Sequence, residues 1–154
     1  MGNFNLATVK TEMPMSPEQI FQLANPLALI GWLSLLASPV FPVASQRIAA
    51  LAVPLLLSIA YAGLVLAFWS GAEGGFSTLA DVMKLFTDPH VALAGWLHYL
   101  AFDLFVGAWA VRTAQAESIR FAFVIPCLAL IFLFGPAGFL LFNLLRASNR
   151  PVQP

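Results

Sequence analysis

A histidine and an aspartate stand inside an apolar stretch that is long enough to cross a lipid bilayer. The segment from Gly95 to Trp109 reads GWLHYLAFDLFVGAW, with His98 and Asp103 five positions apart among aromatic residues. An ionisable side chain at bilayer depth is energetically costly, so such residues are rare and are functional candidates by default. If no partner neutralises it, Asp103 is expected to hold and transfer a proton near neutrality, with His98 as the complementary acid or base.

Both residues also have a structural interpretation. Asp103 can be a carboxylate that bonds to another helix, and the candidate partners are Asn25, Tyr61 and Asn143. His98 can satisfy its imidazole on a carbonyl or a water. On a regular helix the two side chains are about 140° and about 7.5 Å apart, which rules out a direct hydrogen bond. Each therefore needs its own partner, or both reach one ligand from different sides.

A helical projection divides this span into two faces. Trp96, Tyr99 and Asp103 cluster on a polar and aromatic face that is expected to turn toward other helices. Gly107 and Ala110 on that face would let a neighbouring helix or a flat ligand approach closely. The remaining arc carries no polar side chain and is expected to meet lipid. Its members are Leu97, Leu100, Ala101, Leu104, Ala108 and Val111.

The composition indicates a membrane protein. Of the 154 residues, 60% are hydrophobic and 9% are charged, whereas soluble domains carry about 25% charged residues. The net charge of zero argues against nucleic-acid binding. The single Cys127 excludes an internal disulfide. We expect one all-α domain over residues 1–154, a polytopic bundle of about four transmembrane helices.

Four apolar stretches have the length of a spanning helix, about 20 residues. They cover about residues 20–37, 48–69, 91–111 and 119–145. Ser16 is the expected N-cap of the first, and Asp88 that of the third, because each directly precedes a proline at the first helical position.

Prolines interrupt two of these spans. Pro26 cannot donate a hydrogen bond to the carbonyl of Gln22, which leaves an acceptor free beside the amide of Asn25; a kink or a second N-cap is the simpler interpretation. The fourth span is expected to be kinked or split at Pro136, which frees the carbonyl of Phe132. Broken helices with free backbone groups line ligand sites in many membrane proteins, although packing kinks are commoner.

The connection over residues 70–87 is the one long loop. Its apolar residues recur at helical spacing, which predicts a short interfacial helix over about 76–86, either a lid over a site or an anchor for the loop.

The orientation in the membrane does not follow from four crossings. Arg47, Arg112 and Arg120 would then lie on one side, and Lys10, Lys84, Arg146 and Arg150 on the other. The positive-inside rule needs a clearer bias than this, although Arg146 and Arg150 next to the last span favour a cytoplasmic C-terminus.

Several function classes lack their motifs. His90 and His98 are eight positions apart, and there is one cysteine and no HxxxH or CxxC spacing, so no metal site is expected. The chain has no GxSxG element and no phosphate-binding loop.

The pattern GWxHYxxFDLFxGxW at 95–109 resembles the abscisic-acid-deficient-4-like family. Further similar elements are Phe76 to Leu79, Leu85-Phe86, Pro89, Asn25-Pro26, Gly31-Trp32, and Phe134 to Pro136 with Gly138. Together they cover most of the chain from Ser16 to Arg146.

The resemblance implies a membrane protein connected with carotenoids. Plant members of the family are chloroplast proteins required to form neoxanthin from violaxanthin, a conversion that opens an epoxide and forms an allene with loss of a proton. The chemistry implied here is a cofactor-independent isomerisation, with Asp103 and His98 as acid and base in an order that stays open. Trp96, Tyr99, Phe102 and Trp109 would stack along a polyene, and Asn25 and Trp32 are further candidate ligand contacts. Because the long plant transit region is missing, a bacterial cytoplasmic membrane is the expected location.

Two other functions remain open. A non-catalytic subunit could use the same aromatic face to present a carotenoid or other membrane lipid to a partner membrane enzyme, or assemble as a homo-oligomer. A small proton-coupled carrier built on Asp103 and His98 ranks below these, because no repeat relates the two halves.

Overall fold

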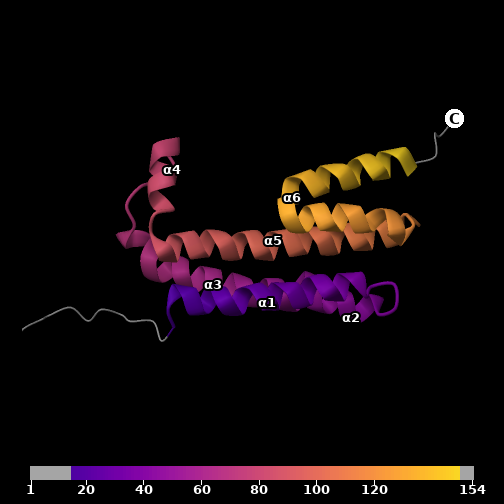
Figure 1. The fold of residues 1–154 in the computed structure, drawn as a ribbon, viewed down its shortest axis with the longest axis horizontal. Coiled ribbons are helices and arrows are strands. Elements are labelled where there is room, and N and C mark those ends of the chain that lie inside the picture. The colour runs from indigo at the N-terminus through magenta and orange to yellow at the C-terminus, as the bar shows by residue number, and fades with distance from the viewer. Residues whose placement is uncertain (1–14, 150–154) are drawn as a thin grey trace, which may run out of the picture.

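The computed structural model describes residues 15–149, and these are helical with short connections (Figure 1). The elements are α1 (Pro17–Leu36), α2 (Pro42–Arg47), a π-helical turn (Ile48–Ala52), α3 (Val53–Phe68), a 3-10 turn (Trp69–Gly71), α4 (Leu79–Leu85), α5 (Pro89–Ala116) and α6 (Phe121–Asn149). Four helical segments have the length and apolar composition to cross a membrane: Pro17–Leu36, Pro42–Gly71, Pro89–Ala116 and Phe121–Asn149. The predicted all-α class with four apolar helices is confirmed.

Both predicted N-caps are confirmed. The hydroxyl of Ser16 accepts from the backbone N–H of Gln19 at 3.3 Å, and the Gln19 side chain accepts from the N–H of Ser16 at 2.9 Å. This reciprocal pair satisfies two N–H groups that the first turn of a helix leaves without partners. At α5 one oxygen of Asp88 accepts from the N–H groups of His90 and Val91, at 2.8 and 3.1 Å.

The second apolar segment begins at Pro42, earlier than the expected residue 48. It runs through α2, the π-helical turn and α3 without a break. Pro54 follows directly after the first residue of α3 and has no N–H to donate to the carbonyl of Ala50. The widened turn at Ile48–Ala52 accommodates this missing donor within an otherwise continuous helix.

Helix α5 is the centre of the bundle. It packs against α1, α3 and α6, and Figure 1 shows it between the α1 and α3 pair and α6. The arc of α5 that was expected to meet lipid is buried, so that prediction is wrong. Its members are Leu97, Leu100, Ala101, Leu104, Ala108 and Val111. Lipid tails are as apolar as these side chains, so the bilayer does not force an apolar face outward; close packing decides. Gly31 of α1 provides such packing, because a Cβ there would overlap Leu104.

Helix α6 is folded back on itself. Phe134 has non-helical dihedrals (φ −146°, ψ 54°), and in Figure 1 the two halves run side by side from a sharp reversal. Pro136 removes a helical donor at the reversal, and Gly138 lets the halves touch, because a Cβ there would overlap the backbone nitrogen of Ile131. The expected kink or split of the fourth apolar segment is therefore confirmed.

Helix α4 lies across the long axis of the bundle, at the end where α5 begins (Figure 1). The hydroxyl of Thr78 caps it by accepting from the N–H of Asp81 at 3.1 Å. Lys84 forms an ion pair of 2.8 Å with Glu73 in the preceding loop. This short helix falls within the expected range of 76–86.

Candidate functional site

The fold-back of α6 brings a freed backbone carbonyl to the middle of α5. Pro136 cannot supply the helical hydrogen bond to the carbonyl of Phe132, and the phenol of Tyr99 donates to that oxygen instead, at 3.1 Å. A side chain of α5 therefore satisfies the backbone group that the sequence leaves open. The tip of α6 and Tyr99 together form one end of the candidate site.

Asp103 lies one turn further along α5, against the same tip. A Cβ on Gly135 would stand 2.8 Å from the carboxyl carbon of Asp103, so only a glycine allows this approach. The carboxyl interacts with the phenol of Tyr99, four residues earlier on α5. Its Oδ2 is buried and has no hydrogen-bond partner among residues 15–149. A buried polar atom without a partner is uncommon and calls for an explanation, and in a membrane span it marks a candidate for proton chemistry.

A groove of about 520 Å³ lies beside this tip, between α1 and α6. Tyr99, Trp96 and Leu100 of α5 line it. The remaining lining residues are Asn25, Pro26, Ala28 and Leu29 of α1, with Phe132 and Leu133 of α6. Apart from the Asn25 amide, the Trp96 indole N–H and the Tyr99 phenol, these side chains are apolar. The groove therefore combines a long apolar surface with a few polar groups at one end, the usual make-up of a small-molecule site.

The polar end of the groove is organised by Asn25. Its Oδ1 accepts from the indole N–H of Trp96 at 3.0 Å, and its Nδ2 donates to the carbonyl of Phe21 at 2.8 Å. The Trp96 ring stacks on Tyr99 with centroids 5.3 Å apart. Because α1 is continuous from Pro17 and Asn25 bonds back into its own helix, the alternative of a second N-cap at Asn25 is wrong.

A second, apolar groove of about 240 Å³ continues the first along α1. The two share Leu29 and Phe132, and the second extends to Trp32 and Leu36. The Trp32 ring meets Phe132 edge-on at 5.4 Å. From Asn25 to Leu36 the combined groove follows about 16 Å of helix, roughly half the thickness of a bilayer core. It therefore has room for one end of a long, narrow apolar molecule.

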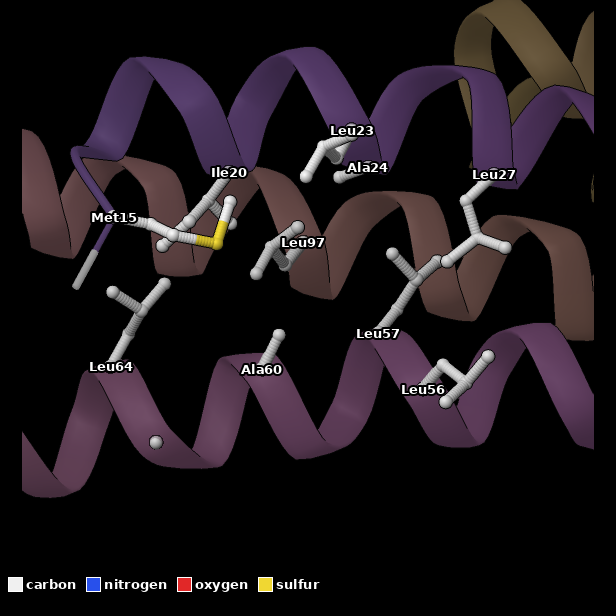
Figure 2. A pocket seen from close by; sticks show the side chains of 11 residues that line it. Met15, Ile20, Leu23, Ala24, Leu27, Leu56, Leu57, Ala60, Leu64 and Leu97 are labelled. Carbon is white, nitrogen blue, oxygen red and sulfur yellow. The ribbon is translucent and has the colours of Figure 1, made fainter. Parts of the chain in front are cut away.

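Another cavity, of about 350 Å³, lies between α1, α3 and α5 (Figure 2). Ile20, Leu57, Leu64 and Leu97 point into it from these three helices, and Met15 closes one end. All its lining side chains are apolar, so it offers room for a hydrocarbon chain but no group for chemistry. The candidate site is therefore the α1–α6 groove with the tip of α6.

The predicted site residues divide among different places. Asn25, Trp32, Trp96 and Tyr99 line the grooves, and Asp103 lies behind Tyr99 at the tip. The other three predicted residues lie elsewhere.

His98 and Phe102 form a separate pair. Their rings stack at 4.5 Å with an interplanar angle of 13°, both are exposed, and Tyr61 of α3 lies 5.8 Å from the imidazole. Asp103 and His98 are thus not brought together, in agreement with the geometry of a regular helix.

Trp109 packs into the contact between α5 and α6. Its ring lies 5.4 Å from each of the rings of Phe139 and Phe142, and the guanidinium of Arg146 covers it at 5.6 Å. In this position it supports the returning half of α6 rather than lining a groove.

The contact of Gly135 with Asp103 and the side chains of Phe132 and Leu133 are parts of the site that sequence reasoning missed, whereas the freed carbonyl of Phe132 was expected. The Gly135-Pro136 pair signalled a break, but nothing in the sequence says that the break would meet Asp103. Phe132 and Leu133 look like ordinary apolar residues.

His90 stacks on Phe68 at 3.7 Å, away from the groove. Among residues 15–149, no three His, Cys, Asp or Glu side chains are grouped to hold a metal ion.

Comparison with known proteins identifies a family. No curated protein and no solved structure matches the chain. The family model described as ABA DEFICIENT 4-like matches residues 19–142, a range that contains both grooves, Asp103 and the tip of α6. The chain belongs to the ABA DEFICIENT 4-like family.

Proposed function

We propose that this protein binds a carotenoid or another isoprenoid lipid in the groove between α1 and α6 and isomerises it by acid/base chemistry at Tyr99 and Asp103. The observation that carries the proposal is the apolar, aromatic groove lined by Tyr99, whose phenol interacts with the Asp103 carboxyl, one oxygen of which is buried without a partner. Membership of a family related to neoxanthin synthesis supports the choice of substrate class.

The groove fits a lipid because it opens sideways within the apolar part of the bundle. Leu29 and Phe132 belong to both grooves and are partly exposed, at 47% and 42%. A ligand can therefore enter from the bilayer without crossing water. Trp32, Trp96 and Tyr99 offer ring surfaces along its length, and aromatic contacts favour a flat conjugated chain.

The chemistry needs one group to protonate an oxygen and one to take a proton from carbon. Tyr99 reaches the groove and interacts with Asp103, so a proton given to a ligand oxygen by the phenol can be replaced from the carboxyl. The carboxylate left behind can then recover a proton lost by the ligand carbon through the same phenol. No electron enters or leaves, and the net change is an isomerisation. We leave His98 out of this cycle because it stacks on Phe102 outside the groove.

A non-catalytic role is the second candidate, and one observation favours it. The Tyr99 proton is donated to the Phe132 carbonyl, so the phenol already has a structural task. In that case the protein holds the lipid for a partner membrane enzyme, and Asp103 only fixes the tip of α6.

The first experiment asks what the groove binds. The protein is purified in mild detergent from a carotenoid-producing host, and the co-purified lipid is identified by absorbance and mass spectrometry. Leu29→Trp should fill the groove and lose most of the bound lipid, whereas Leu66→Trp, at a residue of α3 that is 86% exposed, should retain it. Wild-type protein without any polyene or isoprenoid lipid would contradict both candidates.

The second experiment separates enzyme from binder. Turnover of the identified lipid is followed in liposomes for wild type, Asp103→Asn and His98→Gln. The catalytic proposal expects Asp103→Asn to bind the lipid without converting it and His98→Gln to keep its rate. Full turnover by Asp103→Asn would overturn the catalytic role, and binding without any wild-type turnover would favour the second candidate.

A further inference from the structure

The two ends of α6 lie at the same end of the bundle. Near the end of α6, the guanidinium of Arg146 pairs with the carboxylate of Glu117, with its Nε 2.9 Å from Oε2. Glu117 caps the end of α5 and precedes Phe121, where α6 starts. Figure 1 shows the same relation, because the returning half of α6 runs back toward the end at which the helix began.

The tip of α6 reaches only the middle of α5. Tyr99 and Asp103, which contact the tip, lie near the centre of Pro89–Ala116. Each half of α6, on either side of Phe134, is shorter than the about 20 residues that a spanning helix needs. Non-helical backbone at bilayer depth is tolerated where protein surrounds it. Gly135 is buried and the Phe132 carbonyl is bonded, while the side chain of Phe134 between them is 63% exposed.

Opposite charges occupy the two ends of the bundle. At the end where α5 finishes, Arg112 donates to Gln46 at 2.8 Å, which places α2 and its Arg47 there as well. Arg120 lies in the turn before α6, and Arg146 at its close. Glu117 is the only acid of the described chain at this arginine end.

The opposite end is acidic. Glu18 in the first turn of α1 and the first turn of α5 share one surface pocket, so both helices start there. Asp88 caps α5 at this end, and Glu73 and Asp81 lie around α4. Lys84 is its one lysine or arginine within 15–149.

We infer that α6 is a re-entrant hairpin, that the chain crosses the membrane three times, and that the arginine end is the surface that meets the anionic headgroups of the cytoplasmic leaflet. With Arg146 at the same end as Arg112 and Arg120, the described lysine and arginine residues divide four against one, whereas four crossings would divide them three against two. The positive-inside rule then assigns the arginine end to the cytoplasm. Arg47, Arg112 and Arg120 are exposed, and anionic lipid headgroups attract such basic residues next to a membrane. This inference does not depend on the proposed function.

Single cysteines test the topology. In a Cys127→Ala background, Ser77→Cys, Ala116→Cys and Ala147→Cys each present one exposed thiol, at the acidic end, at the end of α5 and at the end of α6. Intact cells are treated with a membrane-impermeant maleimide. We expect Ser77→Cys to react, and Ala116→Cys and Ala147→Cys to react only after the membrane is opened. Reaction of Ala147→Cys together with Ser77→Cys would show four crossings, and the reverse pattern at all three sites would overturn the orientation.

Lipid binding tests the arginine surface. The full-length protein is reconstituted with phosphatidylglycerol and phosphatidylcholine, and the retained lipids are counted by native mass spectrometry. The triple variant Arg47→Gln, Arg112→Gln and Arg120→Gln should lose its preference for phosphatidylglycerol, whereas Lys84→Gln should keep it. An unchanged preference in the triple variant would overturn the headgroup contact. A folded state is checked for every variant by its far-UV helicity and elution volume.

Discussion

The phenol of Tyr99 donates to the carbonyl oxygen of Phe132, 3.1 Å away, at the position where Pro136 leaves that oxygen without a helical donor. This one bond ties the tip of α6 to the middle of α5. It also holds the tip beside Asp103, which lies one turn along α5 from Tyr99, so the break in α6 and the contact with Asp103 have the same origin.

Replacing Tyr99 with phenylalanine should therefore destabilise the fold. The Phe132 carbonyl would be left without a donor, which we expect to cost about 1 kcal/mol, as interhelical hydrogen bonds in membrane proteins do. The unfolding midpoint in one detergent measures the effect. Tyr61→Phe is the matched control, because no hydrogen bond of its hydroxyl is formed within residues 15–149. Equal midpoints for both variants would contradict the assigned role of Tyr99.

Asp103 and Gly135 should be strongly coupled. Gly135→Ala places a methyl group where the carboxyl of Asp103 lies, and overpacking of this kind costs about 1 to 3 kcal/mol. In an Asp103→Ala background the space is free, so the same glycine substitution should cost much less. A double-mutant cycle of unfolding free energies measures this coupling. Additive effects of the two substitutions would show that the contact between tip and carboxyl is absent.

The local features of the fold were predictable from the sequence, and the long-range ones were not. The caps at Ser16 and Asp88 and the break near Pro136 depend on residues a few positions apart. That α6 folds back depends on contacts of Gly135 and Gly138 with partners that the sequence does not name. A kinked spanning helix and a hairpin are equally compatible with the local pattern.

The candidate site was predictable in its residue types but not in its grouping. A wheel of α5 correctly separates His98 from Asp103, because that relation is internal to one helix. It cannot tell which face meets other helices, since apolar residues pack against lipid and protein alike. The arc around Leu97 and Leu104 is therefore buried, while Phe102 is 56% exposed.

Two glycines of the bundle should respond to alanine in opposite directions. At Gly63 of α3 an added Cβ meets nothing within 4 Å, so Gly63→Ala should stabilise by about 0.5 to 1 kcal/mol through the lower entropy of the unfolded chain. At Gly107 of α5 the Cβ would stand 2.8 Å from the Trp32 ring, so Gly107→Ala should destabilise and disturb the groove. Thermal midpoints in the same detergent test both. A rise for Gly107→Ala would mean that Trp32 has room to move.

The loop before α4 should loosen at both extremes of pH. Hydrogen bonding to Lys84 and its positive charge lower the pKa of the Glu73 carboxyl, and hydrogen bonding to Glu73 and its negative charge raise the pKa of Lys84. The ion pair between Glu73 and Lys84 is thus fully formed above the ordinary carboxyl pKa, and it is lost as pH falls through the lowered pKa of Glu73. On the alkaline side, the ion pair is fully formed below the ordinary lysine pKa, and it is lost as pH rises through the raised pKa of Lys84. Because both side chains are exposed, salt should weaken the ion pair as well.

Limited proteolysis of the loop at residues 71–78 measures this opening. Cleavage should be slowest near neutral pH and low salt, and faster under acid, alkaline or high-salt conditions. Lys84→Gln removes the ion pair and should flatten the profile. Asp81→Asn keeps the ion pair and should keep both limbs of the profile, with the alkaline limb at a lower pH because the Asp81 charge contributes to the raised pKa of Lys84. A flat profile for wild-type protein would show that the ion pair does not hold the loop against α4.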